Sequence, residues 1–477
     1  MASIGVIGAG VGAMTSALRL AHDGHQVTVY EKNSCVGGKL ASREINGFHF
    51  DTGPSLLTWP TVFRQLFSDV GLNLDDYVEL DRLAHTFRYN FADGSHFDCF
   101  DDAHATSASI AENLGATSAR EWEAFMAHSE RVWHAAQATF LTHSLGEVPR
   151  LLASSSVRSL RHIDAFRSLA SRSRSAFSDP RMQAWLNRYS TYSGSDPWRT
   201  PASVSCIPHL EQQMGAWHIK GGMTRLGQAL HDAFISLGGH LHFGSDVERV
   251  ISQQGRIGIQ LAGNVTWHDA VVAGCDAEHL YLDLVSTNKK PRMRRVERST
   301  SGFSMLVQVE SSTKDIAHHN VWFGNEQRRE FREIANGSLA SEPTVYACVS
   351  AVNDPTQAPN GCENWFVLVN TPPGAEVRTV KYGNQVLERL PLSDRIKNIE
   401  YITPEKYGVH TRSRGGAIYG AASNSRMAAF LRPNNKSRIN GLFLAGGSTH
   451  PGGGLPLVAQ SGNIAASLVS KYLEHQQ

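Results

Sequence analysis

A short strand that runs straight into a glycine-rich turn restricts the fold of this chain more than any other feature. Residues 3–13 read SIGVIGAGVGA, and a helical stretch follows them. In such a turn Gly8 permits the tight bend, Gly10 lets a pyrophosphate approach the backbone, and the small Ala13 allows close packing of helix on strand. Together with Gly12 these residues predict a dinucleotide-binding unit.

A carboxylate stands at the end of the second predicted strand. Residues 26–30 read QVTVY, and Glu31 follows them. An acid about twenty residues after the glycines accepts hydrogen bonds from a ribose 2′-hydroxyl. The same charge would repel the 2′-phosphate of NADP. This order of strand, turn, helix, strand and acid favours a dinucleotide site over a glycine turn without a ligand.

A second glycine-rich loop lies near the C-terminus. Residues 446–456, GGSTHPGGGLP, separate a hydrophobic run at 441–445 from a helix of small residues at 457–469. Its glycines and prolines predict a loop defined by the backbone. The N-terminus of the next helix favours an anion or an electron-rich ring. The residues that we expect to contact a cofactor here are Gly446, Gly447, Gly454, Leu455, Pro456 and Val458.

Composition sets broad limits. A chain of 477 residues with 41% hydrophobic content predicts two or more domains. The net charge of +1 supplies no general field for nucleic acid, so we expect no nucleic-acid partner. Its six cysteines include no C-x-x-C pair, which indicates reduced thiols and no metal. No uncharged apolar run approaches the roughly 18 residues of a spanning helix, so we expect a cytoplasmic protein.

The middle of the chain carries a basic, helical region. Residues 103–188 contain few β-branched runs and are predicted to be helical. Leu160, Ile163 and Phe166 recur at helical spacing, which suits a helix lying on anionic lipid at the inner face of the cell membrane. A solvated face on a soluble protein is the alternative. The arginines of this stretch are Arg150, Arg158, Arg161, Arg167, Arg172, Arg174 and Arg181.

Two further motifs resemble a known superfamily. Residues 31–39 fit E-K-x-x-x-x-G-G-[KR], and residues 48–55 fit F-x-x-D-x-G-P-[ST]. Both resemble the FAD-binding N-terminus of the amine-oxidase and phytoene-desaturase superfamily. Family members more often carry arginine where this chain has Lys39, and lysine lacks the planar fork. The resemblance implies FAD contacts by Lys32, Gly38, Lys39, Gly53, Pro54, Ser55 and Val247.

Residues 188–223 carry the resemblance to a narrower family. They read R-Y-x-T-Y-x-G-S-D-P-x-x-x-P-A, then I-P-H-x-E and W-x-x-x-G-G-M. This order resembles bacterial carotenoid desaturases, particularly the branch of 1-hydroxycarotenoid 3,4-desaturase and methoxyneurosporene dehydrogenase. The resemblance implies a polyene tunnel, although each aromatic residue could equally be core. The residues expected to line it are Tyr189, Tyr192, Trp198, Trp217 and His450.

No catalytic acid or base stands out from the sequence. His209 and Glu211 alternate along a predicted strand and would therefore face the same side. They are candidates for a hydrogen-bonded proton relay near the flavin, or for a structural pair. No third ligand is spaced to complete a metal site with them. His318 and His319 are adjacent on another predicted strand, where they would point to opposite faces.

The expected fold is α/β, with a discontinuous Rossmann-type FAD-binding domain and an α+β substrate domain of mixed sheet plus helices. Strands separated by polar turns between 304 and 369 predict the mixed or antiparallel sheet. The FAD-binding domain is expected at 1–75, 215–290 and 438–477. The sheet domain is expected at 76–105, 204–214 and 291–437, and a helical, membrane-facing subdomain at 106–203.

The function implied is an FAD-dependent desaturase that introduces C=C bonds into an acyclic carotenoid or related polyene by hydride transfer to flavin N5. Oxygen or a quinone would reoxidise the flavin. A carotenoid isomerase or a polyene saturase on the same scaffold is the alternative, as is a carotenoid-binding flavoprotein without turnover. An amine oxidase is disfavoured, because its usual G-T-E motif is replaced here by Ser448-Thr449-His450-Pro451.

Overall fold

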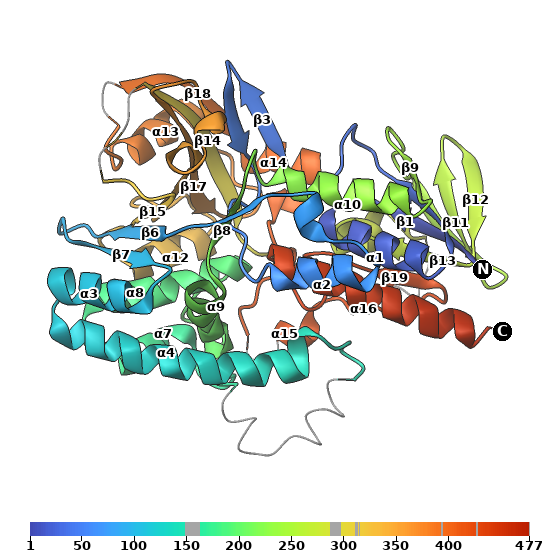
Figure 1. Ribbon diagram of the computed structural model, residues 1–477, viewed down its shortest axis with the longest axis horizontal. Coiled ribbons are helices and arrows are strands. Elements are labelled where there is room, and N and C mark those ends of the chain that lie inside the picture. Colours follow the sequence, from blue (N-terminus) through green and yellow to red (C-terminus); the bar gives the residue numbers. More distant parts are fainter. Residues whose placement is uncertain are drawn as a thin grey trace.

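Two large sheets lie side by side in the computed structural model, with both chain termini beside the smaller one (Figure 1). The helices of residues 103–188 lie beneath the larger sheet in this view. None of the described helices combines the length and apolar character of a membrane span. The structure describes residues 1–147, 163–286, 297–310, 313, 315–392, 395–425 and 428–476.

The smaller sheet is parallel throughout and confirms the predicted Rossmann-type unit. Its strands come from three separate stretches of the chain, which supports our proposal of a discontinuous domain. In order across the sheet they are β19 (Leu442–Leu444), β13 (Ala270–Ala273), β1 (Ser3–Ile7), β2 (Gln26–Tyr30) and β9 (His240–His242).

Each face of this parallel sheet is covered, as its apolar strands require. Ile4, Val6 and Val272 pack in one core with the helices α1 (Val11–His22), α2 (Thr61–Asp69), α10 (Thr224–Ser236) and α16 (Leu455–Glu474). Val271 and Ala273 pack on the other side against an antiparallel sheet of β10 (Arg249–Gln253), β11 (Arg256–Leu261) and β12 (Asn264–His268).

The larger sheet has seven strands and is mixed, as predicted, because β15 and β6 run parallel while every other pair is antiparallel. In order these are β18 (Ile396–Ile402), β14 (Ser301–Glu310), β17 (Cys362–Thr371), β16 (Val345–Val349), β15 (His319–Trp322), β6 (His85–Asn90) and β7 (His96–Phe100).

The two faces of this sheet differ in what they contact. Met305, Val307 and Val367 point to one face and pack against α13 (Thr379–Leu387). Register places Ser304 opposite Leu368, and Leu368 opposite Tyr346, on the other face. These alternating residues form a floor on which a cavity lies.

Helices cover the outer end of the same sheet. The predicted hairpin across Asp93-Gly94 is confirmed as β6 and β7, and its rings Phe87, Tyr89 and Phe97 pack against Trp122 and Trp185. The predicted helical region is confirmed in its described part by α3 (Ala103–Leu114), α4 (Ala116–Ala136), α7 (Leu169–Ala176) and α8 (Pro180–Arg188).

The prediction of a basic amphipathic helix is wrong for the residues of that stretch that the structure describes. Residues 163–168, which include Ile163 and Phe166, form turns before α7 begins. The chain turns at Asp164, whose φ is +53° and whose carboxylate accepts a hydrogen bond of 2.7 Å from Nε of Arg172. Arg150, Arg158, Leu160 and Arg161 lie outside the described residues.

The remaining elements are shorter or connect these layers. They are β3 (Ser42–Ile45), β4 (Phe48–Asp51), β5 (Leu80–Arg82), β8 (Trp217–Ile219), α9 (Ile207–Met214), α11 (Ala277–His279), α12 (Gln327–Ala335), α14 (Pro404–Thr411) and α15 (Ala428–Leu431).

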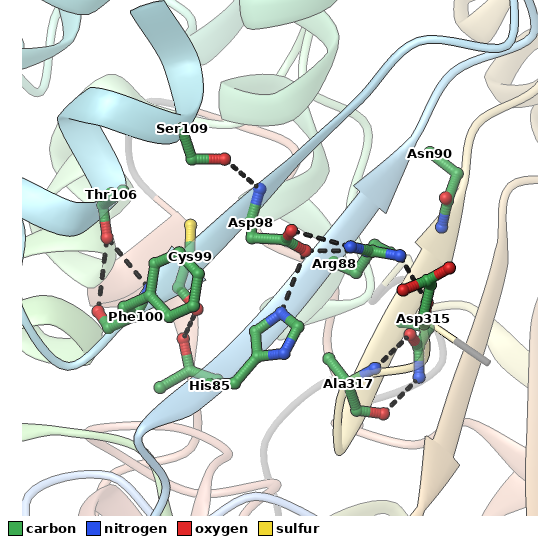
Figure 2. Close-up of polar contacts among 12 residues, drawn as sticks. His85, Arg88, Asn90, Asp98, Cys99, Phe100, Thr106, Ser109, Asp315 and Ala317 are labelled. Atoms are coloured by element: carbon green, nitrogen blue, oxygen red, sulfur yellow. Dashed lines mark hydrogen bonds and ion pairs between the residues drawn. The ribbon is translucent and has the colours of Figure 1, made fainter. Parts of the chain in front are cut away.

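A charged cluster fixes the hairpin that carries part of the cavity floor (Figure 2). Nε and Nη2 of Arg88 each donate to the carboxylate of Asp98 at 2.8 Å, and Nε2 of His85 lies 2.9 Å from the same group. The backbone N–H of Asp98 donates to Oγ of Ser109 in α3 at 2.9 Å. These contacts hold the pKa of Asp98 well below its ordinary value against the opposing effect of burial.

Replacing Asp98 with asparagine should therefore destabilise the fold. The change leaves the guanidinium of Arg88, whose side chain is 15% exposed, without its ionic partner. We expect a loss of roughly 3 kcal/mol, the lower end for breaking a buried ion pair. Chemical unfolding measures it. Asp101→Asn, whose carboxylate is 39% exposed beside Arg82, is the control and should cost less than about 1 kcal/mol. Equal losses would contradict the argument.

Candidate active site

The first glycine turn has the conformation that its residues predict. Gly8 has a φ of +86°, and its N–H donates to the carbonyl of Tyr30 at 2.8 Å. Helix α1 begins at Val11, with Gly10 as its N-cap. The first turn of the helix therefore points its free backbone N–H groups toward the space beyond β1, where an anionic ligand is favoured.

The carboxylate of Glu31 binds the backbone of this turn. Its side chain is 4% exposed, and its carboxylate accepts hydrogen bonds from the backbone N–H groups of Ala9 at 2.7 Å and Asn33 at 2.8 Å. Each oxygen thus uses one lone pair within the protein and keeps another for a ligand. The carboxylate lies at the cavity wall, where a ribose hydroxyl can reach it.

The second glycine loop is folded against the first. A Cβ at Gly12 would lie 2.9 Å from the backbone N of Gly446, so the two loops can touch here only because residue 12 is glycine. Oγ of Ser461 accepts the N–H of Gly446 at 3.1 Å. Nη1 of the buried Arg432 donates to the carbonyl of Gly447 at 3.3 Å, which places a cation behind this loop.

A cavity of about 420 Å³ extends from these loops onto the floor of the seven-stranded sheet. Ala13 does not line it and instead packs against Gly274, where a Cβ would lie 2.4 Å from that of Ala13. The other predicted cofactor residues do line it: Gly8, Gly10, Gly12, Glu31, Lys32, Gly38, Lys39, Gly53, Pro54, Ser55, Val247, Gly446, Gly447, Gly454, Leu455, Pro456 and Val458.

Lys39 is held at the cavity wall by the backbone of another segment. Its Nζ donates to the carbonyl of Ile418 at 2.5 Å and lies 3.4 Å from that of Ala417. Burial lowers the pKa of this ammonium, while Asp276 raises it. The lysine therefore places a positive group where the cofactor segment meets the substrate sheet.

Of the aromatic residues predicted to contact substrate, the structure places Tyr192 at the cavity. Tyr189 is buried in the helical core, and Trp198 packs behind Phe331, which itself lines the cavity. Trp217 donates its Nε1–H to the carbonyl of Met214 at 2.6 Å. His450 lies against Phe140 and bonds to the carbonyl of His143 at 2.8 Å.

The strand predicted for His209 and Glu211 is wrong, because both lie on helix α9. Side chains two positions apart on a helix point in nearly opposite directions, so His209 and Glu211 form no pair. Glu211 accepts hydrogen bonds from the hydroxyls of Tyr189 and Tyr192, whereas the His209 ring lies beside that of His134. Pro208 stands in the first turn of the helix, a position that tolerates proline.

Several cavity residues were missed by the sequence interpretation. Arg188 and Tyr346 line the cavity, and the Tyr346 hydroxyl lies 2.6 Å from Oγ of Ser55 and 2.9 Å from Nδ1 of His319. Arg188 is the first residue of the motif that begins R-Y-x-T-Y, so the sequence did contain a signal for it. The expectation that His318 and His319 face opposite sides is wrong: His318 precedes β15, and the two rings lie 4.6 Å apart.

Glu330 is a buried acid at the cavity, also missed. It is 2% exposed and accepts hydrogen bonds from the N–H of Thr344 at 3.0 Å and from its Oγ1 at 2.7 Å. Burial raises its pKa from 4.5 to about 7, although these hydrogen bonds oppose the rise. The protonated, neutral form is therefore favoured in the folded protein up to about neutral pH.

This raised pKa predicts a pH-dependent effect of Glu330→Gln. Between pH 4.5 and about 7 the folded protein keeps a proton that the unfolded chain releases, so the wild type loses stability as pH rises. Glutamine stays neutral and keeps an accepting oxygen. We therefore measure the Tm of the variant minus the Tm of wild type at each pH. This difference should be larger at about pH 8 than at about pH 5 by about 2 °C or more. The exposed Glu112→Gln serves as control, and a pH-independent difference would contradict the assignment.

These residues fit a flavin dinucleotide. The glycines at both loops leave room for a ligand to approach the backbone, and the Glu31 carboxylate at the end of β2 keeps acceptor capacity for a ribose hydroxyl. The family model of flavin containing amine oxidoreductases matches residues 14–470.

Full-length relatives agree with this match. The chain is 32% identical over 483 residues to the 1-hydroxycarotenoid 3,4-desaturase of Flavobacterium sp. (strain P99-3), covering 97% of this chain and 98% of that protein. It is 33% identical over 480 residues to the 4,4′-diapolycopene oxygenase of Methylomonas sp, covering 96% of each.

Solved structures share the fold at low identity. Putrescine oxidase has a TM-score of 0.67 at 12% identity, and cyclohexylamine oxidase from Brevibacterium oxydans IH-35A has 0.66 at 13%. Each comparison covers 99% of both chains. The cofactor is FAD, and the chain belongs to the flavin containing amine oxidoreductase family as an oxidoreductase of its carotenoid desaturase branch.

Proposed function

We propose that this protein introduces C=C bonds into an acyclic carotenoid or related polyene. The observation that carries the proposal is a single cavity that joins the two glycine loops to a floor containing Phe87, Phe366 and Leu368. A largely apolar floor next to a flavin site suits a long hydrocarbon better than a charged amine. The names of the relatives, a carotenoid desaturase and a carotenoid oxygenase, support the same substrate class.

Desaturation removes a hydride and a proton from adjacent carbons and leaves a double bond between them. Bound FAD supplies the two-electron acceptor, with N5 as the atom that takes hydride. The contribution of the protein is to align an allylic carbon with that position and to exclude water. Glu31 and the two glycine loops hold the dinucleotide, and Ser304, Leu368 and Tyr346 support the polyene from the sheet.

A route for the proton is available on the helical side. The Tyr192 hydroxyl lines the cavity and donates to Glu211, which is 8% exposed. Burial raises the pKa of Glu211, which makes the carboxylate a better proton acceptor. We therefore propose Glu211 as the acceptor, reached through Tyr192. His209 is set aside because it lies on the other side of α9.

Anaerobic mixing of the FAD-loaded protein with an acyclic carotenoid tests the reaction. One flavin should be reduced for each double bond formed, because no other two-electron acceptor is present. Flavin absorbance and product mass measure the two quantities. Loss of two hydrogens identifies desaturation, gain of oxygen after readmission of air identifies oxygenation, and product without flavin reduction identifies isomerisation. Either of the last two outcomes would contradict the proposal.

A variant of the cavity floor tests where the substrate binds, and a surface variant is its matched control. Ser304→Phe adds a ring to the cavity floor and should abolish turnover of the carotenoid while FAD remains bound. Ser467→Phe adds the same ring at an exposed position of α16 and should leave turnover unchanged. Unimpaired turnover in Ser304→Phe would place the substrate elsewhere.

We also propose that the protein takes its substrate from the inner surface of the cell membrane and that oxygen or a quinone reoxidises the flavin. Helix α15 leaves Phe430 41% exposed and Leu431 68% exposed. The Phe430 ring lies 5.8 Å from that of Phe140, and the Phe140 ring lies 4.7 Å from that of His450 in the second glycine loop. An exposed apolar surface is thus continuous with side chains that lead toward the cavity.

Membrane contact predicts that Phe430→Ser with Leu431→Ser lowers co-sedimentation with anionic liposomes. Removing these side chains takes away apolar area that would insert among the lipids. Val409→Ser, which replaces a side chain that is 71% exposed on α14, is the control and should co-sediment like wild type. Equal co-sedimentation of all three proteins would exclude α15 as the contact.

A further inference from the structure

A buried guanidinium projects into the substrate end of the cavity. Arg188 ends helix α8, is 7% exposed, and lines the cavity. Four aromatic rings surround its Cζ atom, with their centroids at 5.3 Å for Phe87, 5.4 Å for Tyr192, 5.6 Å for Tyr89 and 5.8 Å for Tyr346. This aromatic cage fixes the cation by its ring faces and leaves its hydrogen-bond donors largely free.

The protein itself does little to satisfy those donors. A guanidinium carries five N–H donors. Within the described residues, the one hydrogen bond of this group runs from Nη1 to the hydroxyl of Tyr89 at a long 3.5 Å, and it forms no ion pair. The acid of this region, Glu211, is engaged by Tyr189 and Tyr192. A buried charge with so few partners is costly unless a ligand supplies acceptors.

Another buried arginine of the site shows the contrast. Arg432 is 6% exposed, and its Nη1 donates to the backbone carbonyls of Tyr419 at 3.1 Å and Gly447 at 3.3 Å. Its role in holding the second glycine loop is therefore complete within the protein. Among the described residues, no backbone carbonyl accepts from the side chain of Arg188 in this way, and Arg188 lines the cavity that a substrate would fill.

We propose that Arg188 is a specificity-determining residue that binds an oxygen atom carried by the polyene, as a hydroxyl, methoxy or carbonyl group. This inference rests on the proposed function and assigns recognition of the oxygen to one side chain. An oxygen in the aromatic cage accepts the guanidinium N–H groups. A hydrocarbon lacking it leaves the buried donors unpaired, which is the arrangement that rejects such an analogue most strongly.

The test compares two acyclic carotenoids that differ only in a terminal hydroxyl. The FAD-loaded wild type should show a kcat/KM for the hydroxylated chain at least about tenfold higher, the ratio expected from one hydrogen bond to a charged group. Arg188→Met should bring the ratio close to unity, mainly by raising KM for the hydroxylated chain. Arg188→Lys keeps the charge but not the fork and should give an intermediate ratio.

Controls separate recognition from folding and from cofactor binding. Arg328→Met removes an exposed arginine that lies over Trp198 outside the cavity and should keep the wild-type ratio. FAD content should be unchanged in the Arg188 variants, and a single cooperative thermal transition shows that they are folded. If Arg188→Met lacks folded protein, the lysine variant decides. If the variants retain the wild-type preference for the hydroxylated carotenoid, the inference is overturned, whether or not the flavin spectrum changes.

Binding distinguishes this inference from the reaction itself. Titration of each carotenoid, followed by the shift of its absorbance on binding, needs no turnover. If wild type forms no double bond from either carotenoid, the proposed function fails, while tighter binding of the hydroxylated chain that is lost in Arg188→Met still supports the role of Arg188. Equal binding of both carotenoids by wild type would overturn that role.

Discussion

The close contact between the first glycine turn and the C-terminal helix is the constraint on which the site depends. A Cβ at Gly462 in α16 would lie 2.4 Å from the carbonyl oxygen of Gly12, and a Cβ at Gly12 would lie 2.9 Å from the backbone of Gly446. Hard-core repulsion at such distances admits only glycine. Because these backbones touch, the two ends of the chain form one wall of the cavity.

The other wall is one face of the seven-stranded sheet. The two walls meet where Oγ of Ser55, in the cofactor segment, lies 2.6 Å from the hydroxyl of Tyr346 on β16. The same tyrosine ring belongs to the aromatic cage of Arg188. The hairpin that carries Phe87 is held by the Arg88–Asp98 pair (Figure 2). Cofactor segment, sheet and hairpin thus position the guanidinium of Arg188 at the cavity.

Local patterns explain which elements could be predicted. Strand β1, the glycine turn and Glu31 lie within about thirty consecutive residues, and a βαβ unit of that length has a recognisable pattern. His209 and Glu211 were misread because two alternating residues after a proline fit both an extended strand and a helix with proline in its first turn. At residues 163–168 the contact of Asp164 with Arg172 overrode the helical spacing.

The sequence by itself determined the dinucleotide turn, the second glycine loop and the strands of the larger sheet, because backbone conformation and hydrophobic alternation there depend on neighbouring residues. The tertiary structure alone decided which side chains share the cavity. Arg188 comes from α8, Phe87 and Tyr89 from β6, and Tyr346 from β16. Whether a charged side chain is buried, and among which rings, depends on how elements far apart in the sequence pack together. No local sequence pattern encodes that packing.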